Sequence, residues 1–266
     1  MDTFTTSDKQ SFEKHGFVQL ASPLSSDEVQ LLASELSRVE RTPLHVSFER
    51  NRTTPRAYHG CHLSNPVFSA LPCLPQLLIP VMALLEGSVY LYQFKINLKS
   101  AFDGDAWPWH RDYSFWKHED EMPAPLALTA AIYLDDVTEF NGPMFVIPGS
   151  HKADVESTAA EEADPANWEK NFSSDLAHRA TRDEVATLAA RHGLVANIAP
   201  KGSIVLFHCN LLHGSPGNMS PMSRRVVLLT YNRVDNVPLK VARPHFLVHP
   251  PTPALCPLSV SSLTLL

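Results

Sequence analysis

The segment 89–98 constrains the fold more than any other part of the chain, because its side chains repeat with the period of two typical of a β-strand. One predicted face consists of Tyr90, Tyr92, Phe94, Ile96 and Leu98. The opposite face begins with Val89 and Leu91 and continues with Gln93, Lys95 and Asn97. Three polar side chains on an otherwise apolar strand are costly in a dry core unless they have partners. A solvent-exposed face is one interpretation; we favour a polar-lined interior that holds a ligand.

The segments around this strand predict helices first and strands afterwards. Capping signals at Ser7 and Ser25 predict two helices near the start of the chain, and a third helix is expected over 74–85. Short strands are expected at 17–20, 127–134, 143–147, 203–209 and 226–232. A polar stretch without a predicted element covers 40–66, and a charged, Ala-rich insert with helical character covers about 152–195. Residues 1–266 are therefore predicted to form one domain, a β-sandwich or barrel with N-terminal helices.

Composition and charge argue against several classes of protein. The net charge is −6, the isoelectric point is near 6.1 and there is no basic stripe, so nucleic-acid binding is not expected. No run of 18 apolar residues occurs and the first residues lack an apolar core, so neither a membrane span nor a signal peptide is expected. The four cysteines form no Cys-x-x-Cys pair, which favours a reducing, cytoplasmic setting over a zinc knuckle or disulfide framework.

The residues that carry chemistry are concentrated in the segment 107–116, where one residue separates His110 from Asp112. On an extended strand these two side chains point the same way and can reach one metal ion. A third ligand, His213, follows about 100 residues later. Two histidines and one carboxylate form the facial triad of non-haem Fe(II) oxygenases, which leaves positions open for substrate and O2. A catalytic zinc accepts the same ligand set.

The third ligand has an alternative. A lone His-x-Asp triplet is a weak signal in a chain with 13 histidines, although the residues that follow make the pattern more specific. His208 lies inside an apolar run, where a histidine of the core or of a strand face is the simpler interpretation. His213 lies just past the predicted strand end beside Gly214, where a loop can turn the ring toward the metal. We therefore favour His213.

Arg224 completes the pattern, because it lies eleven residues after His213 and just before the last predicted strand. A fixed guanidinium beside an open iron can bind a distal carboxylate with two hydrogen bonds, as a 2-oxo dicarboxylate cosubstrate requires. Arg225 is the alternative anchor. Neighbouring strand residues point to opposite faces of a sheet, so only one of the two can serve.

These motifs together resemble the phytanoyl-CoA dioxygenase superfamily. The resemblance rests on YQFKIN (92–97), WPWHRDYSFWKHEDEMP (107–123), NGPMFVIPGSH (141–151), HGSPGNMSP (213–221), Arg224 and TYN (230–232). Within the superfamily, the chain is similar to ectoine hydroxylases and more similar to free L-proline trans-4-hydroxylases, which share RAYHGCH (56–62) and LTYNRVDN (229–236) in similar form. Arg111 stands between the two predicted ligands where ectoine hydroxylases carry a small residue. The similarity covers roughly 10–250 and is weakest over 152–195.

The resemblance implies an all-β core in the form of a double-stranded β-helix, the cupin-like jelly roll, with N-terminal helices and a helical insert or lid. It implies an enzyme that uses Fe(II), 2-oxoglutarate and O2 to hydroxylate a small free amino acid, with L-proline first and trans-4-hydroxylation expected. The alternatives are another substrate, whether ectoine-like, pipecolate, carrier-bound or a natural-product scaffold, and a non-catalytic barrel. The expected partner is a small amino acid, with no nucleic acid or membrane, and the expected state is a monomer or homodimer.

The resemblance also assigns roles to individual residues. Fe(II) would be bound by His110, Asp112 and His213. The 2-oxoglutarate site would consist of Arg224 and Ser215 at the far carboxylate, with Asn97 also in contact. The substrate pocket would be lined by Gln93, Trp107 and Trp116, while Arg56, Tyr58 and His59 are expected near the amino-acid headgroup.

Overall fold

The computed structural model describes residues 4–20, 23–153, 172, 176–251 and 253–265. Its α-helices are α1 (Thr6–His15), α2 (Ser26–Arg41), α3 (Pro66–Ala70), α4 (Pro75–Leu85), α5 (Asp112–Glu119) and α6 (Arg182–His192). Its strands are β1 (Phe17–Leu20), β2 (Val46–Phe48), β3 (Pro55–His59), β4 (Val89–Lys99), β5 (Trp107–His110), β6 (Ala127–Tyr133), β7 (Met144–Val146), β8 (Val195–Asn197), β9 (Ile204–His208), β10 (His213–Ser215) and β11 (Arg224–Arg233).

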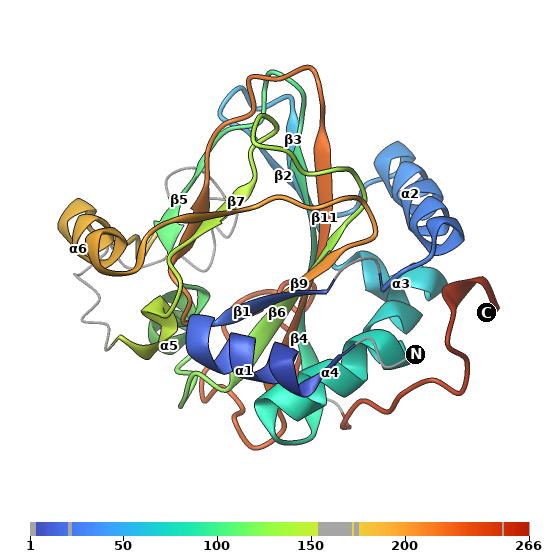
Figure 1. The fold of residues 1–266 in the computed structure, drawn as a ribbon. Coiled ribbons are helices and arrows are strands. Elements are labelled where there is room, and N and C mark those ends of the chain that lie inside the picture. The colour runs from blue at the N-terminus through green and yellow to red at the C-terminus, as the bar shows by residue number, and fades with distance from the viewer. Residues whose placement is uncertain (1–3, 21–22, 154–171, 173–175, 252, 266) are drawn as a thin grey trace.

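The strands form two antiparallel sheets. The larger sheet has seven strands in the order β1-β9-β6-β11-β4-β3-β2, and the smaller has four in the order β5-β10-β7-β8. Figure 1 shows the smaller sheet facing the larger one across the centre of the molecule. This arrangement confirms the predicted jelly-roll core, with the difference from a barrel that the two sheets stay separate.

Helices cover the outer face of the larger sheet, the face turned away from the smaller sheet (Figure 1). Leu32 and Leu36 of α2 and Leu78 of α4 are fully buried, and they belong to one apolar cluster with Phe94 and Ile96 of β4. The helix α2 begins with the predicted capping box, in which Ser25 and Glu28 bond each other's backbone amides. This packing supplies a dry outer layer behind the sheet.

Some element boundaries differ from the sequence prediction. The capping box of α1 is formed by Thr5 and Asp8 and not by Ser7, and Gly16 ends the helix in a left-handed conformation. Glu86, with φ of 52°, ends α4. The polar stretch 40–66 contains β2 and β3, which no local periodicity revealed; β2 pairs with β3, and β3 pairs with β4.

The alternation along β4 is interrupted by a bulge. In the pairing with β11, Gln93 lies opposite Thr230 and Leu91 lies opposite Tyr231, so Tyr92 is an extra residue. The prediction that Leu91 shares a face with Gln93 was therefore wrong. Val89 and Leu91 pack with the outer helices, whereas Tyr90 and Tyr92 belong to a second cluster on the inner side. The bulge places two consecutive residues, Tyr92 and Gln93, toward the interior.

The described part of the insert is connected to the smaller sheet. Its helix α6 is capped by Thr181, whose side chain accepts from the Glu184 amide, and α6 lies beside α5 and β5 in Figure 1. The region 154–171 and 173–175, where further helical character was predicted, lies outside the described residues.

Within the described residues, no single helix is long and apolar enough to cross a membrane. The helix pair Pro66–Cys73 and Pro75–Leu85 reaches the required length and apolar character only when both are taken together, with a bend of 44° between them.

Candidate active site

Strands β5 and β10 place two histidines opposite each other. His110 ends β5 and His213 begins β10, and the two residues are direct partners in the antiparallel pairing. Asp112 is the first residue of α5, after Arg111 in an extended backbone conformation. The prediction that His110 and Asp112 share one extended strand was therefore wrong, as was the prediction that His213 lies in a loop. The turn from β5 into α5 places the side chains of His110 and Asp112 close together, as an extended strand would also have done.

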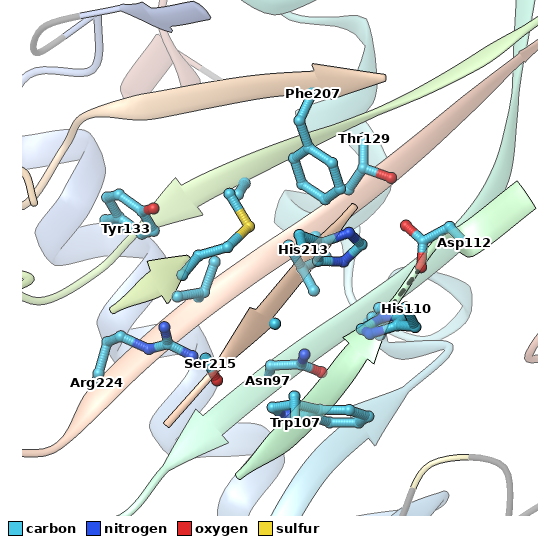
Figure 2. Close-up of a pocket in the computed structure, with 16 residues that line it drawn as sticks. Asn97, Trp107, His110, Asp112, Thr129, Tyr133, Phe207, His213, Ser215 and Arg224 are labelled. Atoms are coloured by element: carbon cyan, nitrogen blue, oxygen red, sulfur yellow. Dashed lines mark ion pairs between the residues drawn. The ribbon is translucent and has the colours of Figure 1, made fainter. Parts of the chain in front are cut away.

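The structure brings His110, Asp112 and His213 together as a candidate metal site (Figure 2). Their ligand atoms all lie within 4.8 Å of one another, and His110 Nε2 is 3.7 Å from Asp112 Oδ1. His110 Nδ1 lies 2.6 Å from the Pro108 carbonyl oxygen, and His213 Nδ1 lies 3.0 Å from the Leu211 carbonyl oxygen. A carbonyl can only accept, so each Nδ1 carries the proton and each Nε2 keeps a lone pair for a metal.

The protonation states of this triad also suit a metal. Burial lowers the pKa of His110 to about 3, with His213 adding to the effect, and burial lowers the pKa of His213. Burial alone would raise the pKa of Asp112, but His213, Lys95 and His110 hold that pKa below its usual value. At neutral pH the triad offers two neutral imidazoles and one carboxylate, which is the deprotonated donor set that a divalent metal needs.

A hollow extends from the triad between the two sheets, and we call it the polar hollow because unpaired polar atoms reach into its largely apolar wall (Figure 2). Five buried atoms that line it have no hydrogen-bond partner among the described residues: Asn97 Oδ1, Trp107 Nε1, Tyr133 Oη, Ser215 Oγ and Arg224 Nε. They come from five different strands. Because buried polar atoms are nearly always hydrogen-bonded in folded proteins, five such atoms in one hollow indicate that a polar ligand belongs there.

Two neighbouring arginines of β11 point to opposite faces of the larger sheet, as predicted. Arg224 lines the polar hollow, lies at the end away from the triad in Figure 2, and donates from Nη1 to the Gly142 carbonyl at 2.5 Å. Arg225 forms a two-bonded pair with Asp135, with Nε 2.9 Å from Oδ2 and Nη2 2.6 Å from Oδ1. Arg224 therefore keeps donor groups for a carboxylate in the hollow, whereas the Arg225 fork is already bound.

A second hollow meets the first at the triad. Its lining shares Lys95, Trp107, His110 and Asp112 with the first hollow, and adds Gln93, Arg111, Phe115, Trp116, Phe172, Leu176, Ala177 and Arg243. The predicted substrate-contact residues Gln93, Trp107 and Trp116 all lie in this lining. The second hollow therefore brings aromatic faces and charged groups together directly beside the triad.

Three cations, Lys95, Arg111 and Arg243, line the second hollow, and Arg243 and Lys95 differ in how they are paired. Arg243 is bound by Asp120, which accepts from its Nε at 3.0 Å and also accepts from Tyr92. Gln93 lies against the same guanidinium, with its amide oxygen 3.1 Å from Nη1 in the orientation that satisfies both groups. Lys95 has no ion pair in the described part of the chain; burial lowers its pKa, while Asp112 acts in the opposite direction. Lys95 is thus a half-buried cation that lacks a counter-charge of its own apart from the triad.

The residues expected at the amino-acid headgroup lie elsewhere. Arg56 is fully buried in a pair with Glu49 and stacks over the Trp107 ring, 3.7 Å from its centroid. Tyr58 packs in the outer apolar cluster, and His59 bonds Ser47 at 3.2 Å. None of Arg56, Tyr58 and His59 lines either hollow, so Arg56 reaches the site only through Trp107.

His208, the alternative third ligand, lies away from the triad. Its ring is 5.3 Å from the ring of His151, and its Nδ1 accepts from the Asn210 amide at 3.0 Å. His208 therefore has a local structural role at the end of β9. Trp109, between the lining residues Trp107 and His110 on β5, packs with the cluster around Ile147 and Leu212 and lines neither hollow.

Sequence reasoning did not assign three of the residues that line the hollows. Lys95 was visible as part of the polar face of 89–98, but without an assigned role. Tyr133 ends the apolar strand β6, and Arg243 lies in the segment after β11; neither belongs to a local pattern that could have indicated a site. Only the folded structure shows that Lys95, Tyr133 and Arg243 line the two hollows beside the triad.

Comparisons with known proteins agree on one family. The sequence model of the family described as phytanoyl-CoA dioxygenase (PhyH) matches residues 12–226. The L-proline trans-4-hydroxylase of Streptomyces griseoviridis is 39% identical over 258 residues, covering 96% of each chain. The ectoine dioxygenase of Stutzerimonas stutzeri is 32% identical over 233 residues, covering 85% of this chain and 76% of that one. The crystal structure of EctD from S. alaskensis with 2-oxoglutarate and 5-hydroxyectoine has a TM-score of 0.82 at 29% identity, covering 98% and 89% of the two chains. A structure of EctD with bound Fe has a TM-score of 0.81 at 28% identity, covering 96% and 88%.

Proposed function

This chain belongs to the phytanoyl-CoA dioxygenase family, and on that premise we propose that it is an Fe(II)- and 2-oxoglutarate-dependent hydroxylase of free L-proline that forms the trans-4-hydroxy product. The relative with 39% identity over nearly the whole chain is a hydroxylase of this substrate. The observation that carries the proposal is the position of the His110–Asp112–His213 triad at the junction of two hollows, of which one fits a dicarboxylate and the other an amino acid.

The triad would hold the iron. Two imidazoles and one carboxylate match the ligand set of non-haem Fe(II) oxygenases, and a related structure contains Fe. Fe(II), 2-oxoglutarate and O2 together supply the oxidising chemistry that hydroxylates an unactivated C–H bond while the cosubstrate leaves as succinate and CO2. The chain's own contribution is to fix Nε2 of His110 and of His213 through the bonds that their Nδ1 groups donate to backbone carbonyls.

The polar hollow would hold 2-oxoglutarate. Arg224 is 5% exposed, and its Nε has no partner among the described residues, so a carboxylate can accept from it. Ser215 Oγ and Tyr133 Oη are further donors without partners in the same hollow, and Asn97 borders it from β4. These groups match the two acidic ends of a short dicarboxylate better than they match an apolar ligand.

The second hollow would hold the amino acid. A free amino acid has a carboxylate, and Lys95 is the half-buried cation there without an ion pair in the described chain. The apolar ring of proline would lie against the aromatic side chains of Phe115, Trp116 and Trp107, where a protonated ring nitrogen also has favourable contacts with ring faces. Gln93, held by Arg243, offers a fixed amide for orientation.

The test is hydroxylation of a panel of small molecules by the purified protein with Fe(II) and 2-oxoglutarate. The panel contains L-proline, L-pipecolate, ectoine and L-prolinamide, and products are identified by mass spectrometry and NMR. We expect trans-4-hydroxy-L-proline as the main product, with prolinamide at least about tenfold poorer because it lacks the charge that Lys95 binds. Hydroxylation of ectoine and not of proline would replace the proposed substrate while leaving the enzyme class intact.

We also propose that residues 1–266 act as one catalytic domain in the cytoplasm, as a monomer or homodimer with small molecules as its only partners. All four cysteines are free thiols, and Cys61 and Cys209 are buried, which suits a reducing compartment. Light scattering on the purified protein measures the oligomeric state, and cell fractionation measures the location.

A further inference from the structure

Arg111 lies between the triad residues His110 and Asp112, and its side chain connects three separate segments. It precedes α5, and its side chain is 1% exposed. Its Nε donates to the Asn210 carbonyl at 3.1 Å, in the turn that leads to His213. Its Nη1 forms an ion pair with Glu184 in the first turn of α6. The Arg111 side chain thus links the segment of His110 and Asp112, to which it belongs, with the turn before His213 and with helix α6 of the insert.

The segment before α6 is bound to the triad segment along its length. The Ala180 amide donates to the Trp109 carbonyl at 2.9 Å, and Arg179 forms a β-bridge with His110. His178 Nε2 is 2.8 Å from Glu119 Oε1. The preceding residues Leu176 and Ala177 line the second hollow. The segment 176–184 is therefore one wall of the proposed substrate pocket, and Arg111 holds its far end.

Glu184 is well placed as the anchor for this connection. It is the third residue of α6, and its amide donates to the capping Thr181 at 3.1 Å, which fixes its backbone. A carboxylate in the first turn of a helix is also favoured by the helix dipole. Its side chain is 26% exposed, so a substitution there does not open a core cavity.

We propose that Arg111 is a positioning residue that keeps the wall 176–184 in register with the triad, and that its pair with Glu184 carries this coupling. The proposal rests on the proposed function for the identity of the substrate. The planar guanidinium binds Asn210 and Glu184 through different nitrogens at the same time, which a lysine ammonium on a flexible stem does not reproduce. When the wall is released, the substrate is held less accurately while the 2-oxoglutarate hollow is unchanged.

The first test is Glu184→Ala, assayed for both succinate and hydroxylated amino acid. We expect the ratio of succinate to hydroxylated product to rise about fivefold or more, with the KM for 2-oxoglutarate within about twofold of wild type. Arg111→Met should have the same effect, and Arg111→Lys should restore only part of the coupling. A loss of both products in equal proportion, with the ratio unchanged, would overturn the proposal because it would indicate a general structural role.

The control is Asp135→Asn, which removes the charge of the carboxylate that pairs with Arg225; the Asp135 side chain is 22% exposed, close to the 26% of Glu184. We expect this variant to keep the wild-type product ratio. An increase in that ratio equal to the one in Glu184→Ala would contradict a specific role of Arg111.

The second measurement is hydrogen exchange, which does not depend on the substrate. Without added amino acid, the amides of Ala180 and of α6 should exchange about tenfold faster in Glu184→Ala than in wild type, because the wall opens locally. Unchanged exchange in these amides would overturn the proposal. A wild-type protein that hydroxylates no panel member would contradict the proposed function and leave this comparison intact.

Discussion

The two faces of the larger sheet are built by alternate residues of the same strands, yet they have opposite character. On the outer face, Phe94 of β4 and Leu229 of β11 are at most 1% exposed and pack under the helices. On the inner face, Asn97 of β4 and Arg224 of β11 are also buried, but each has a polar atom without a partner among the described residues. The outer face is fully packed without a ligand, whereas the inner face keeps polar atoms that a ligand could bond.

Within one strand, the outer-face residues therefore contribute mainly to stability and the inner-face polar residues mainly to ligand binding. An apolar residue on the outer face stabilises the fold through burial, whereas an unpaired polar group on the inner face lowers stability until a ligand satisfies it. Outer-face substitutions should therefore change the free energy of unfolding and leave binding constants alone. Substitutions of polar residues on the inner face should change binding constants and leave the free energy of unfolding nearly unchanged.

The largest expected effect is on the inner side, from Asp112→Ala. Removing the carboxylate leaves two neutral imidazoles, so the site loses its only anionic ligand and hydroxylation should be abolished. The protein should stay folded, because the Asp112 side chain is small and 12% exposed, so that its loss opens no core cavity. Product formation at saturating Fe(II) is the measurement, and wild-type-like turnover would show that the ligand assignment is wrong.

The next effect belongs to the outer face. Phe94→Ala removes a buried ring from the cluster beneath α4, which should lower the free energy of unfolding by ~3–5 kcal/mol. Denaturant unfolding measures the loss. The KM for 2-oxoglutarate, measured in the protein that remains folded, should not change. A large rise in that KM would contradict the separation of the two faces.

Lys95→Met, one residue further along β4, should have the opposite profile. The variant keeps the length of the side chain and removes the cation, so the KM for the amino acid should rise about tenfold or more while unfolding is little affected. Stability should even increase slightly, because a half-buried charge without an ion pair in the described chain is removed. An unchanged KM would mean that the substrate carboxylate binds elsewhere, and Arg243 would be the next candidate.

The last prediction concerns pH, and its effect is smallest near neutral pH and accumulates only as the pH falls. Burial lowers the pKa of His62, which stacks against Phe94 on the outer side, to about 3, with His249 adding to the effect. In the unfolded chain His62 binds a proton near pH 6.5, whereas in the folded protein it binds one only near pH 3. The free energy of unfolding therefore falls as the pH drops from 6.5 toward 3. His62→Phe should reduce that slope by up to about 1.4 kcal/mol per pH unit, measured by denaturant unfolding at several pH values. An identical slope in the variant would show that His62 is protonated in the folded state.

Much of this division could be predicted from sequence, where it depends on local patterns. The alternation in 89–98 predicted a polar interior face, and the adjacency of Arg224 and Arg225 predicted opposite orientations, which the structure confirms. The bulge at Tyr92 was not predictable, because it depends on pairing with β11, more than 130 residues away in the sequence. Lys95 and Tyr133 likewise acquire their neighbours only when distant strands pair.

The most direct test of the account compares the two arginines of β11 in one assay. Arg224→Lys keeps the charge and loses the planar fork on the inner face, and Arg225→Lys makes the same change in the Asp135 pair on the outer face. Titration of 2-oxoglutarate, with succinate formation as the readout, should show a KM raised about tenfold or more for Arg224→Lys. Arg225→Lys should leave that KM within about twofold of wild type. If Arg225 and not Arg224 controls the KM, the inner face has been assigned to the wrong residues and the separation of the two faces fails.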